Sequence, residues 1–134
     1  MYKHKVQYYE TDKMGITHHS NYVRWMEEAR VDALEKAGLP YDMLERRGVI
    51  SPVVSVQCRY LHSSEFADVI NIDVRLESFT GVRMKFRYDM SKEDGTKVCE
   101  AESEHCFLNE DGFPLRLKKN FPDIYEALIA MSEN

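Results

Sequence analysis

Residues 20–38 read SNYVRWMEEARVDALEKAG, and their pattern predicts the helix around which the fold is organised. Ser20 can cap the N-terminus of this helix, whereas Gly38 and the nearby Pro40 end it. Pro40 can also open a second, short helix that runs through Arg47. Apolar or small residues recur at spacings of three and four, the period of an amphipathic helix; they are Tyr22, Met26, Ala29, Ala33 and Ala37.

The segments on either side of this helix predict strands. Lys5 to Tyr9 reads as a short strand, and an irregular stretch leads from it to the helix. After the second helix the hydrophobic period changes to two, because apolar residues alternate with polar ones as in half-buried antiparallel strands. Asp94 and Gly95 predict a hairpin turn between two of these strands. The alternating segments run over residues 54–60, 70–77, 83–90 and 99–107.

Two short elements complete the predicted order. A last short strand reaches about Leu117, and Pro122 can start a C-terminal helix through Met131. Only one helix is long enough to cover a sheet of this size, so we expect it to lie across the apolar face of the sheet. The predicted fold is therefore α+β, with an antiparallel sheet of about five strands wrapped around one long central helix. The 134 residues suit a single domain over residues 1–134.

Composition excludes several classes of protein. The chain is 43% apolar and 31% charged, which disfavours disorder, and its net charge of -5 disfavours nucleic acid as a partner. Residues 1–9 show no signal peptide, and no run of about 18 apolar residues exists, so we expect a cytoplasmic protein without membrane insertion. Three cysteines without CxxC spacing predict free thiols and no metal site; they are Cys58, Cys99 and Cys106.

The densest group of polar side chains lies where the first strand gives way to the long helix. It comprises residues 8–12, Gly15 and residues 18–22. The N-terminus of a helix carries unpaired N–H groups and partial positive charge, which can polarise a carbonyl and favour an ionised Asp12 as base or nucleophile. Two structural alternatives exist, because Asp12 can instead close an Asx turn and Glu10 can be a solvated loop acid.

Residues 8–30, YYETDKMGITHHSNYVRWMEEAR, resemble the signature of the 4-hydroxybenzoyl-CoA thioesterase family, which has the hotdog fold. Asp12 stands at the family's catalytic aspartate, and Gly15 stands at its glycine. His19 falls in the first helical turn, where related acyl-CoA thioesterases carry a histidine, and Tyr8 stands where they carry a tyrosine. Two residues depart from the pattern: a glutamate at position 10 replaces the commoner aspartate, and His18 occupies a position that is often aromatic. These departures leave the acyl preference open.

The resemblance implies that the protein hydrolyses an acyl-CoA thioester to free acid and CoA, with no cofactor. Asp12 is implied to act either as nucleophile, giving a mixed anhydride, or as general base for water. The backbone N–H of His19 is implied to polarise the thioester carbonyl, and its imidazole to orient Asp12 or water. Tyr8 is implied as a hydrogen-bond partner in catalysis, and Gly15 and His18 are implied as substrate-binding residues.

Coenzyme A also needs cations for its phosphates. Family members often carry an Arg and Lys cluster in the loop at residues 78–82, but here that loop reads SFTGV. Arg83 is the nearest replacement, and Lys118 with Lys119 forms a second basic patch, so these three are candidates for substrate binding. The alternative is that the row Arg83, Lys85 and Arg87 makes cross-strand ion pairs with Glu102 and Glu104.

Other titratable residues predict structural roles. Glu27 and Arg30, three residues apart on the helix, indicate an ion pair within the helix. His62 and His105 are typical of hydrogen-bonded structural histidines. His18 and His19 lack the spacing of metal ligands, so we expect no metal.

Two other functions remain open. Acyl-acyl carrier protein thioesterases and non-catalytic acyl-CoA-binding proteins share the hotdog fold, and the acidic net charge disfavours docking of an acidic carrier protein. The resemblance further implies assembly into a homodimer or homotetramer, with part of the acyl pocket supplied by the partner chain. An uncovered sheet edge gives a physical reason for such assembly.

Overall fold

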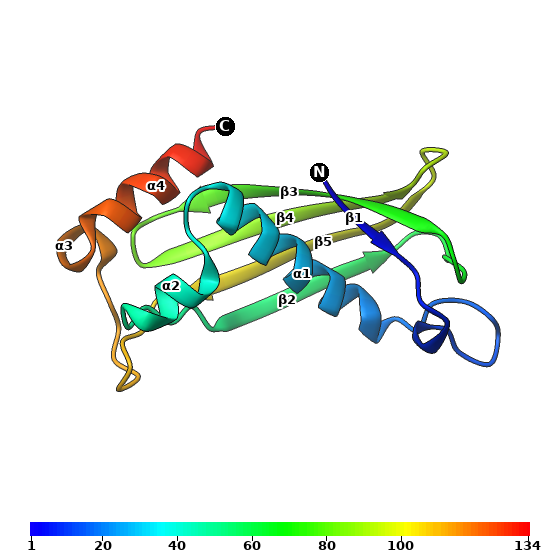
Figure 1. Ribbon diagram of the computed structural model, residues 1–134, viewed down its shortest axis with the longest axis horizontal. Helices are drawn as coiled ribbons and strands as arrows, with labels where there is room; N and C mark the ends of the chain where they lie inside the picture. The colour runs from blue at the N-terminus through cyan, green and yellow to red at the C-terminus, as the bar shows by residue number, and fades with distance from the viewer.

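The structure is a computed structural model that describes residues 1–134, and its centre is a five-stranded antiparallel sheet (Figure 1). The strands lie in the order β1-β3-β4-β5-β2, so β1 and β2 form the two edges. The hairpin predicted at Asp94 and Gly95 joins β4 to β5. The strands are β1 (Tyr2–Lys5), β2 (Val53–Tyr60), β3 (Val69–Phe79), β4 (Arg83–Lys92) and β5 (Lys97–Cys106).

One long helix, α1 (Ser20–Lys36), lies across one face of this sheet (Figure 1). The predicted α+β class, with about five strands around one central helix, is confirmed. Neither α1 nor any other helix combines the length and the apolar character that a membrane crossing needs. The shorter helices are η1 (Tyr8–Glu10, a 3-10 helix), α2 (Tyr41–Arg46), α3 (Leu117–Asn120) and α4 (Pro122–Ser132).

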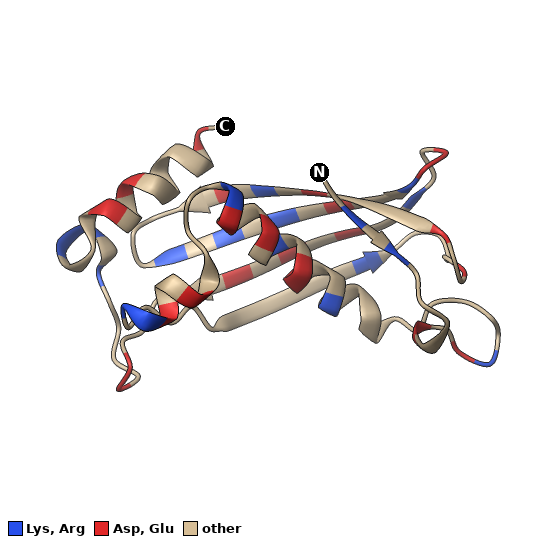
Figure 2. Ribbon diagram, viewed as in Figure 1, with Lys and Arg blue, Asp and Glu red and all other residues tan.

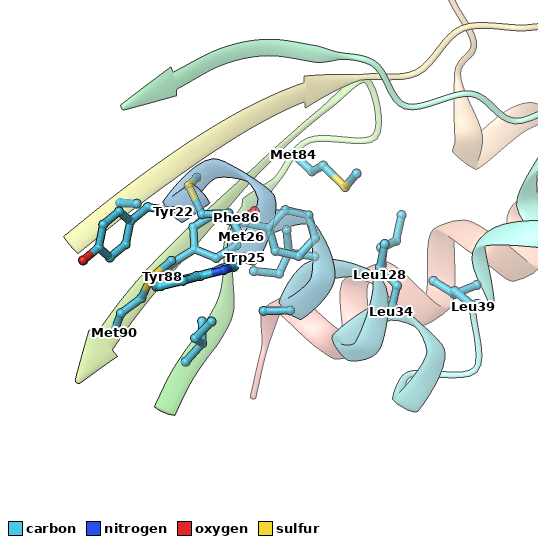
Figure 3. Packing of buried hydrophobic residues seen from close by; sticks show 14 of the residues in the cluster. Tyr22, Trp25, Met26, Leu34, Leu39, Met84, Phe86, Tyr88, Met90 and Leu128 are labelled. Atoms are coloured by element: carbon cyan, nitrogen blue, oxygen red, sulfur yellow. The ribbon is translucent and has the colours of Figure 1, made fainter. Parts of the chain in front are cut away.

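The core fills the space between α1 and the sheet. Trp25 and Met26 of α1 are almost completely buried, and Figure 3 shows them gathered with side chains of β4. Every second residue of β4 points into this core, as the period of two predicts: Met84, Phe86, Tyr88 and Met90 are buried. A buried aliphatic or aromatic side chain contributes about 1.5–3 kcal/mol, so this layer fixes α1, and with it the start of the helix, relative to the sheet.

The predicted strand over Lys5 to Tyr9 is wrong at both ends. Strand β1 pairs with β3 from Tyr2, opposite Ile72, as far as Lys5, opposite Val69. The chain then turns into η1, because the N–H of Gln7 donates to the carboxylate of Glu10 at 2.7 Å. A side-chain acceptor three residues ahead therefore ends the strand and starts a turn.

The predicted last strand that reaches Leu117 is also wrong. Only an isolated bridge between Leu108 and Pro114 is present, and Leu117 begins helix α3. The N–H of Leu115 still donates to the carbonyl of Phe107 at 2.8 Å, but the N–H of Leu117 turns to the carbonyl of Gly81 at 3.3 Å, so the pairing ends there.

The edge strand β2 exposes apolar side chains. Val53, Val54, Val56 and Tyr60 each keep more than 40% of their surface accessible. An apolar edge with unpaired backbone groups is a surface that proteins usually cover. This edge lies beside α1, on the same side as the start of the helix (Figure 1).

Candidate active site

The loop between η1 and α1 is anchored by one buried carboxylate. Glu10 is only 4% exposed, and one of its oxygens accepts hydrogen bonds from the N–H of Gln7 at 2.7 Å and from His4 Nε2 at 2.8 Å. The other oxygen accepts from the indole N–H of Trp25 at 2.8 Å. Burial raises the pKa of Glu10, but these hydrogen bonds outweigh burial and hold the pKa below its ordinary value of 4.5. The interpretation of Glu10 as a solvated loop acid is therefore wrong.

The backbone around Glu10 closes the loop. The carbonyl of Glu10 accepts the N–H of His18 at 2.8 Å and the side-chain amide of Asn21 at 3.0 Å. A second clamp joins Thr17 to Ser64, through the backbone N–H at 2.8 Å and through the two hydroxyls at 2.6 Å. The eight residues from position 10 to position 17 are thus held at both ends, and Asp12 projects from a fixed loop.

Asp12 sits in a tight turn with one free carboxylate oxygen. Its Oδ1 accepts the N–H of Met14 at 2.8 Å, which is the Asx turn considered from the sequence. Its backbone carbonyl accepts the N–H of Gly15 at 2.9 Å, and Gly15 has a φ of 80°, a conformation that suits glycine. Oδ2 has no hydrogen-bond partner within the chain. The structural and catalytic interpretations are therefore compatible, since the turn occupies one oxygen and leaves the other available.

The start of α1 offers an unpaired backbone donor. His19 is the N-cap residue, and its N–H donates to no acceptor in the chain. The next N–H groups are satisfied locally, because Asn21 donates to the carbonyl of His18. Ser20 does not cap the helix as predicted; its hydroxyl pairs with Nδ1 of His18 at 2.9 Å. A free N–H thus stands at the positive end of the helix dipole.

An open cavity of about 890 Å³ lies at this junction. Three of the predicted site residues, Tyr8, Asp12 and His18, line it together. Two cations that sequence reasoning missed, Lys13 and Arg24, also line it. Arg24 lies one helical turn after Ser20, so helical spacing alone could have placed it here. The complete lining is Tyr8, Tyr9, Thr11, Asp12, Lys13, His18, Ser20, Asn21 and Arg24.

His19 and Gly15 do not line this cavity, and Tyr8 lines it with a largely exposed ring. The ring of His19 stacks on His18 at 4.4 Å and approaches Tyr60 of β2 at 6.1 Å, so the ring faces β2. Tyr8 lines the cavity but is 77% exposed, and its ring packs edge-on against Phe66 without a hydrogen bond from its hydroxyl. Gly15 occupies the exposed tip of the loop and contributes its backbone conformation.

The predicted phosphate ligands Arg83, Lys118 and Lys119 lie far from Asp12 within one chain. Helix α3 and the start of β4 stand at one end of the long axis of the molecule, and the loop before α1 stands at the other end (Figure 2). Arg83 pairs with Glu104 at 3.9 Å. The basic row on β4 makes the cross-strand ion pairs considered from the sequence: Arg83–Glu104, Lys85–Glu102 and Arg87–Glu102.

Comparison with known proteins places the chain in a family. Residues 6–128 match the model of the thioesterase-like superfamily. The structure of DHNA-CoA thioesterase from Staphylococcus aureus superposes with a TM-score of 0.94 at 32% identity, covering 98% of this chain and 89% of that one. YneP of Bacillus subtilis, whose name includes the words acyl-CoA thioesterase, is 32% identical over 124 residues, covering 92% of this chain and 90% of YneP. The 4-hydroxybenzoyl-CoA thioesterase of a Pseudomonas species is 26% identical over 119 residues, covering 84% of each chain. The chain therefore belongs to the thioesterase-like superfamily, and the resemblance found in residues 8–30 is confirmed.

Proposed function

We propose that this protein, an acyl-CoA thioesterase, cleaves its substrate at the cavity formed by the Asp12 loop and the start of α1. The observation that carries this proposal is that Asp12 and the first residues of α1, Ser20 and Asn21, line one cavity. Asp12 keeps a free carboxylate oxygen on a loop anchored at both ends, and the N–H of His19 is unpaired at the positive end of α1. Attack on a thioester requires both a base or nucleophile and a group that stabilises the oxyanion.

The free oxygen of Asp12 supports two routes. As general base, Oδ2 takes a proton from water while the water oxygen adds to the thioester carbon. As nucleophile, Oδ2 adds to that carbon itself, and the tetrahedral intermediate expels CoA thiolate to leave a mixed anhydride. Water then hydrolyses this anhydride and restores Asp12. In both routes the carbonyl oxygen gains negative charge next to the N–H of His19. In the general-base route the water adduct expels CoA thiolate, and in either route the thiolate takes up a proton, so one water is consumed and one acid and one thiol form.

We assign the polarisation of the thioester carbonyl to the backbone N–H of His19. Its ring stacks on His18 at 4.4 Å and approaches Tyr60 of β2 at 6.1 Å, so we assign the ring to the wall of the site beside β2. Tyr8 and His18 line the cavity and serve as contacts for the substrate. Gly15 acts indirectly, because its positive φ closes the turn that holds Asp12.

Lys13 and Arg24 are the nearest candidates for the phosphates of CoA. Both line the cavity beside Asp12. Arg24 is free to bind an anion, since the ion pairs of α1 involve Glu28 and Lys36 instead. Guanidinium and ammonium groups are the usual protein partners of phosphate. Arg83, Lys118 and Lys119 can reach a site at Asp12 only from a second copy of the chain.

We further propose that the protein assembles as a homodimer or homotetramer through β2. Its exposed valines and unpaired backbone make it the edge best suited to meet a second copy. The start of α1 lies beside this edge, so the partner can complete the acyl pocket. Light scattering at micromolar concentration tests this proposal, and a monomer there contradicts it.

One assay tests the proposed reaction. Release of free thiol is followed for a panel of short, long and aromatic acyl-CoA esters, with wild type and Asp12→Asn side by side. Asparagine keeps an oxygen that can accept the N–H of Met14, so the turn persists while the anionic oxygen is lost. We expect turnover to fall by about 10²–10⁴-fold, the usual contribution of a general base. Unchanged turnover rules out Asp12, and no thiol release from any ester in wild type favours a binding protein that holds acyl-CoA intact.

A further inference from the structure

A second cavity, of about 180 Å³, lies between α1 and the edge strand β2. We call it the Arg30 cavity. Its rim is apolar, because Val23, Val53 and Val56 all face it. Residue His19 lies along the same side of α1, the side that faces β2. At the other end of β2, the hydroxyl of Tyr60 lies 3.5 Å from the carbonyl of His19. Its full lining is Val23, Met26, Glu27, Arg30, Tyr41, Ser51, Pro52, Val53 and Val56.

Arg30 is a buried cation without a carboxylate partner. It is only 8% exposed, yet the ion pairs of α1 are made by Glu28 and Lys36. The pair predicted between Glu27 and Arg30 does not form. The only hydrogen bond of the guanidinium runs from Nη1 to the hydroxyl of Tyr88 at 3.0 Å. None of its nitrogens is both fully buried and unpaired, so the remaining N–H groups open onto solvent through the cavity that Arg30 lines.

Glu27 lines the same cavity but makes no ion pair with Arg30, and no other carboxylate of the chain lies within ion-pair distance of the guanidinium. Nδ1 of His105 faces the carbonyl of Ser51 at 3.3 Å and must carry the proton, so Nε2 accepts from the hydroxyl of Ser103 at 2.8 Å. Ser103 in turn accepts from Tyr88 at 2.6 Å, and Tyr88 accepts from Arg30. Burial and the charge of Arg30 lower the pKa of His105 to about 4, so the imidazole is neutral. The chain of hydrogen bonds therefore runs away from Arg30 without meeting an anion.

A buried cation without a counterion is costly, which points to an anionic ligand. The distance suits an acyl group. Arg30 lies eleven residues after His19, or about 16 Å along the helix, and its side chain leans back toward the helix start, leaving about 10 Å to the thioester. An extended chain spans about 1.2 Å per bond, so an acyl group of about six to eight carbons spans about 6–8 Å, and a hydrogen bond of about 2.8 Å to the guanidinium covers the rest. The volume also suits such a group, since a cavity of about 150 Å³ holds benzene.

We propose that the Arg30 cavity binds the far end of the acyl group, and that this end carries a carboxylate. The substrate class is then the CoA monothioester of a dicarboxylic acid of about six to eight carbons. This inference rests on the proposed function and specifies its substrate. The carboxylate and the guanidinium can form paired hydrogen bonds, which a neutral acyl end cannot replace.

The test compares matched pairs of esters. Values of kcat and KM are measured for adipyl-CoA against hexanoyl-CoA and for suberyl-CoA against octanoyl-CoA. We expect wild type to favour the carboxylated ester by about 10-fold or more in kcat/KM, as a hydrogen-bonded charge pair of about 1.5–3 kcal/mol implies. In Arg30→Met the ratio should fall to about one, mainly through a higher KM for the carboxylated esters. A wild-type ratio near one overturns the proposal without recourse to any variant.

Arg24→Met is the matched control, because Arg24 lies on the same helix, also without an ion pair, but lines the Asp12 cavity. Arg24→Met should lower kcat/KM equally for the two esters of each pair and leave the ratio of their kcat/KM values unchanged. Tyr88→Phe removes the hydrogen bond to Arg30 but keeps its charge, so it should lower the melting temperature and retain a ratio above one. If Arg30→Met instead slows both members of each pair equally, Arg30 has a structural role and the proposal fails.

Binding separates this proposal from the proposed reaction. Titration calorimetry of Asp12→Asn with the same four esters measures the preference without hydrolysis. We expect Asp12→Asn to bind adipyl-CoA more tightly than hexanoyl-CoA, and the double variant with Arg30→Met to bind the two esters equally. This result supports the Arg30 cavity even if wild type hydrolyses no ester. Hydrolysis of every ester with equal binding of both members overturns the Arg30 proposal and leaves the reaction standing. Preferred hydrolysis of 4-hydroxybenzoyl-CoA, unaffected by Arg30→Met, also overturns it.

Discussion

Replacement of Glu10 by glutamine tests the idea that a buried anion holds the catalytic loop. The carboxylate accepts three hydrogen bonds, from Gln7, His4 and Trp25. A glutamine oxygen can take the place of only one carboxylate oxygen, so its amide group must face at least one donor. Losing one hydrogen bond to a charged group costs about 1.5–3 kcal/mol, and the donor left unpaired adds to this, for a total of about 3 kcal/mol. For a chain of this size we expect a fall of about 10 °C in the melting temperature.

The same substitution should reduce activity, because the carbonyl of Glu10 positions His18 and Asn21 at the start of α1. A displacement of about 1 Å near a reacting centre costs about 10²-fold in rate. Thermal unfolding and thiol release are therefore measured together. Glu28→Gln is the matched control: Glu28 contacts the same His4 at 3.4 Å but is 41% exposed, so its loss should cost under about 1 kcal/mol.

The effect of Glu10 should also depend on pH. Its pKa is depressed in the folded protein, so its stabilisation is fully present above its ordinary value of 4.5 and is lost as the pH falls through the folded value. The difference between wild type and Glu10→Gln should therefore be largest near pH 7 and narrow below pH 4.5. Equal stability of Glu10→Gln and Glu28→Gln at pH 7 would refute this account of the loop.

Three further outcomes are expected. The pKa of His105 is lowered to about 4, so wild type should lose about 3 kcal/mol of unfolding free energy as the pH falls from 6.5 to 4. Urea titrations at each pH measure this loss, which should be far smaller in His105→Gln. Lys13→Met should raise the KM for acyl-CoA but not for the matching N-acetylcysteamine thioester, which lacks phosphates; an equal rise for both contradicts a role in phosphate binding. Val54→Lys places a charge on the exposed edge β2 and should shift light scattering toward monomer, whereas an unchanged mass excludes β2 as the interface.

Local patterns predicted the elements of the fold well. Helix α1 runs from Ser20 to Lys36, close to the predicted bounds. It was predictable because its apolar spacing and the glycine that follows its end lie within one segment. The alternation on β4 likewise predicts which side chains enter the core, since period and face are properties of the strand itself. The turn at η1 escaped prediction because a competing hydrogen bond to Glu10 decides where strand β1 stops.

The site was predictable only where its residues are neighbours in sequence. Asp12 and His18 could be grouped because the loop that carries them is short. The role of Glu10 depends on Trp25 and His4, which approach it from two other elements, and no local pattern encodes this meeting. Arg30 misled sequence reasoning in the opposite way, because Glu27 lies at a favourable helical spacing but makes no ion pair with it.

The most direct test of the central claim compares two aspartates in the same kind of turn. Oδ1 of Asp12 accepts the N–H of Met14 at 2.8 Å, and Oδ1 of Asp94 accepts the N–H of Thr96 at 2.9 Å in the hairpin between β4 and β5. Thiol release from the best acyl-CoA substrate is measured for Asp12→Asn and Asp94→Asn, with melting temperatures recorded for both. We expect turnover to fall by about 10²-fold or more in Asp12→Asn alone, with similar melting temperatures for the two variants. Equal turnover of the two variants would contradict it.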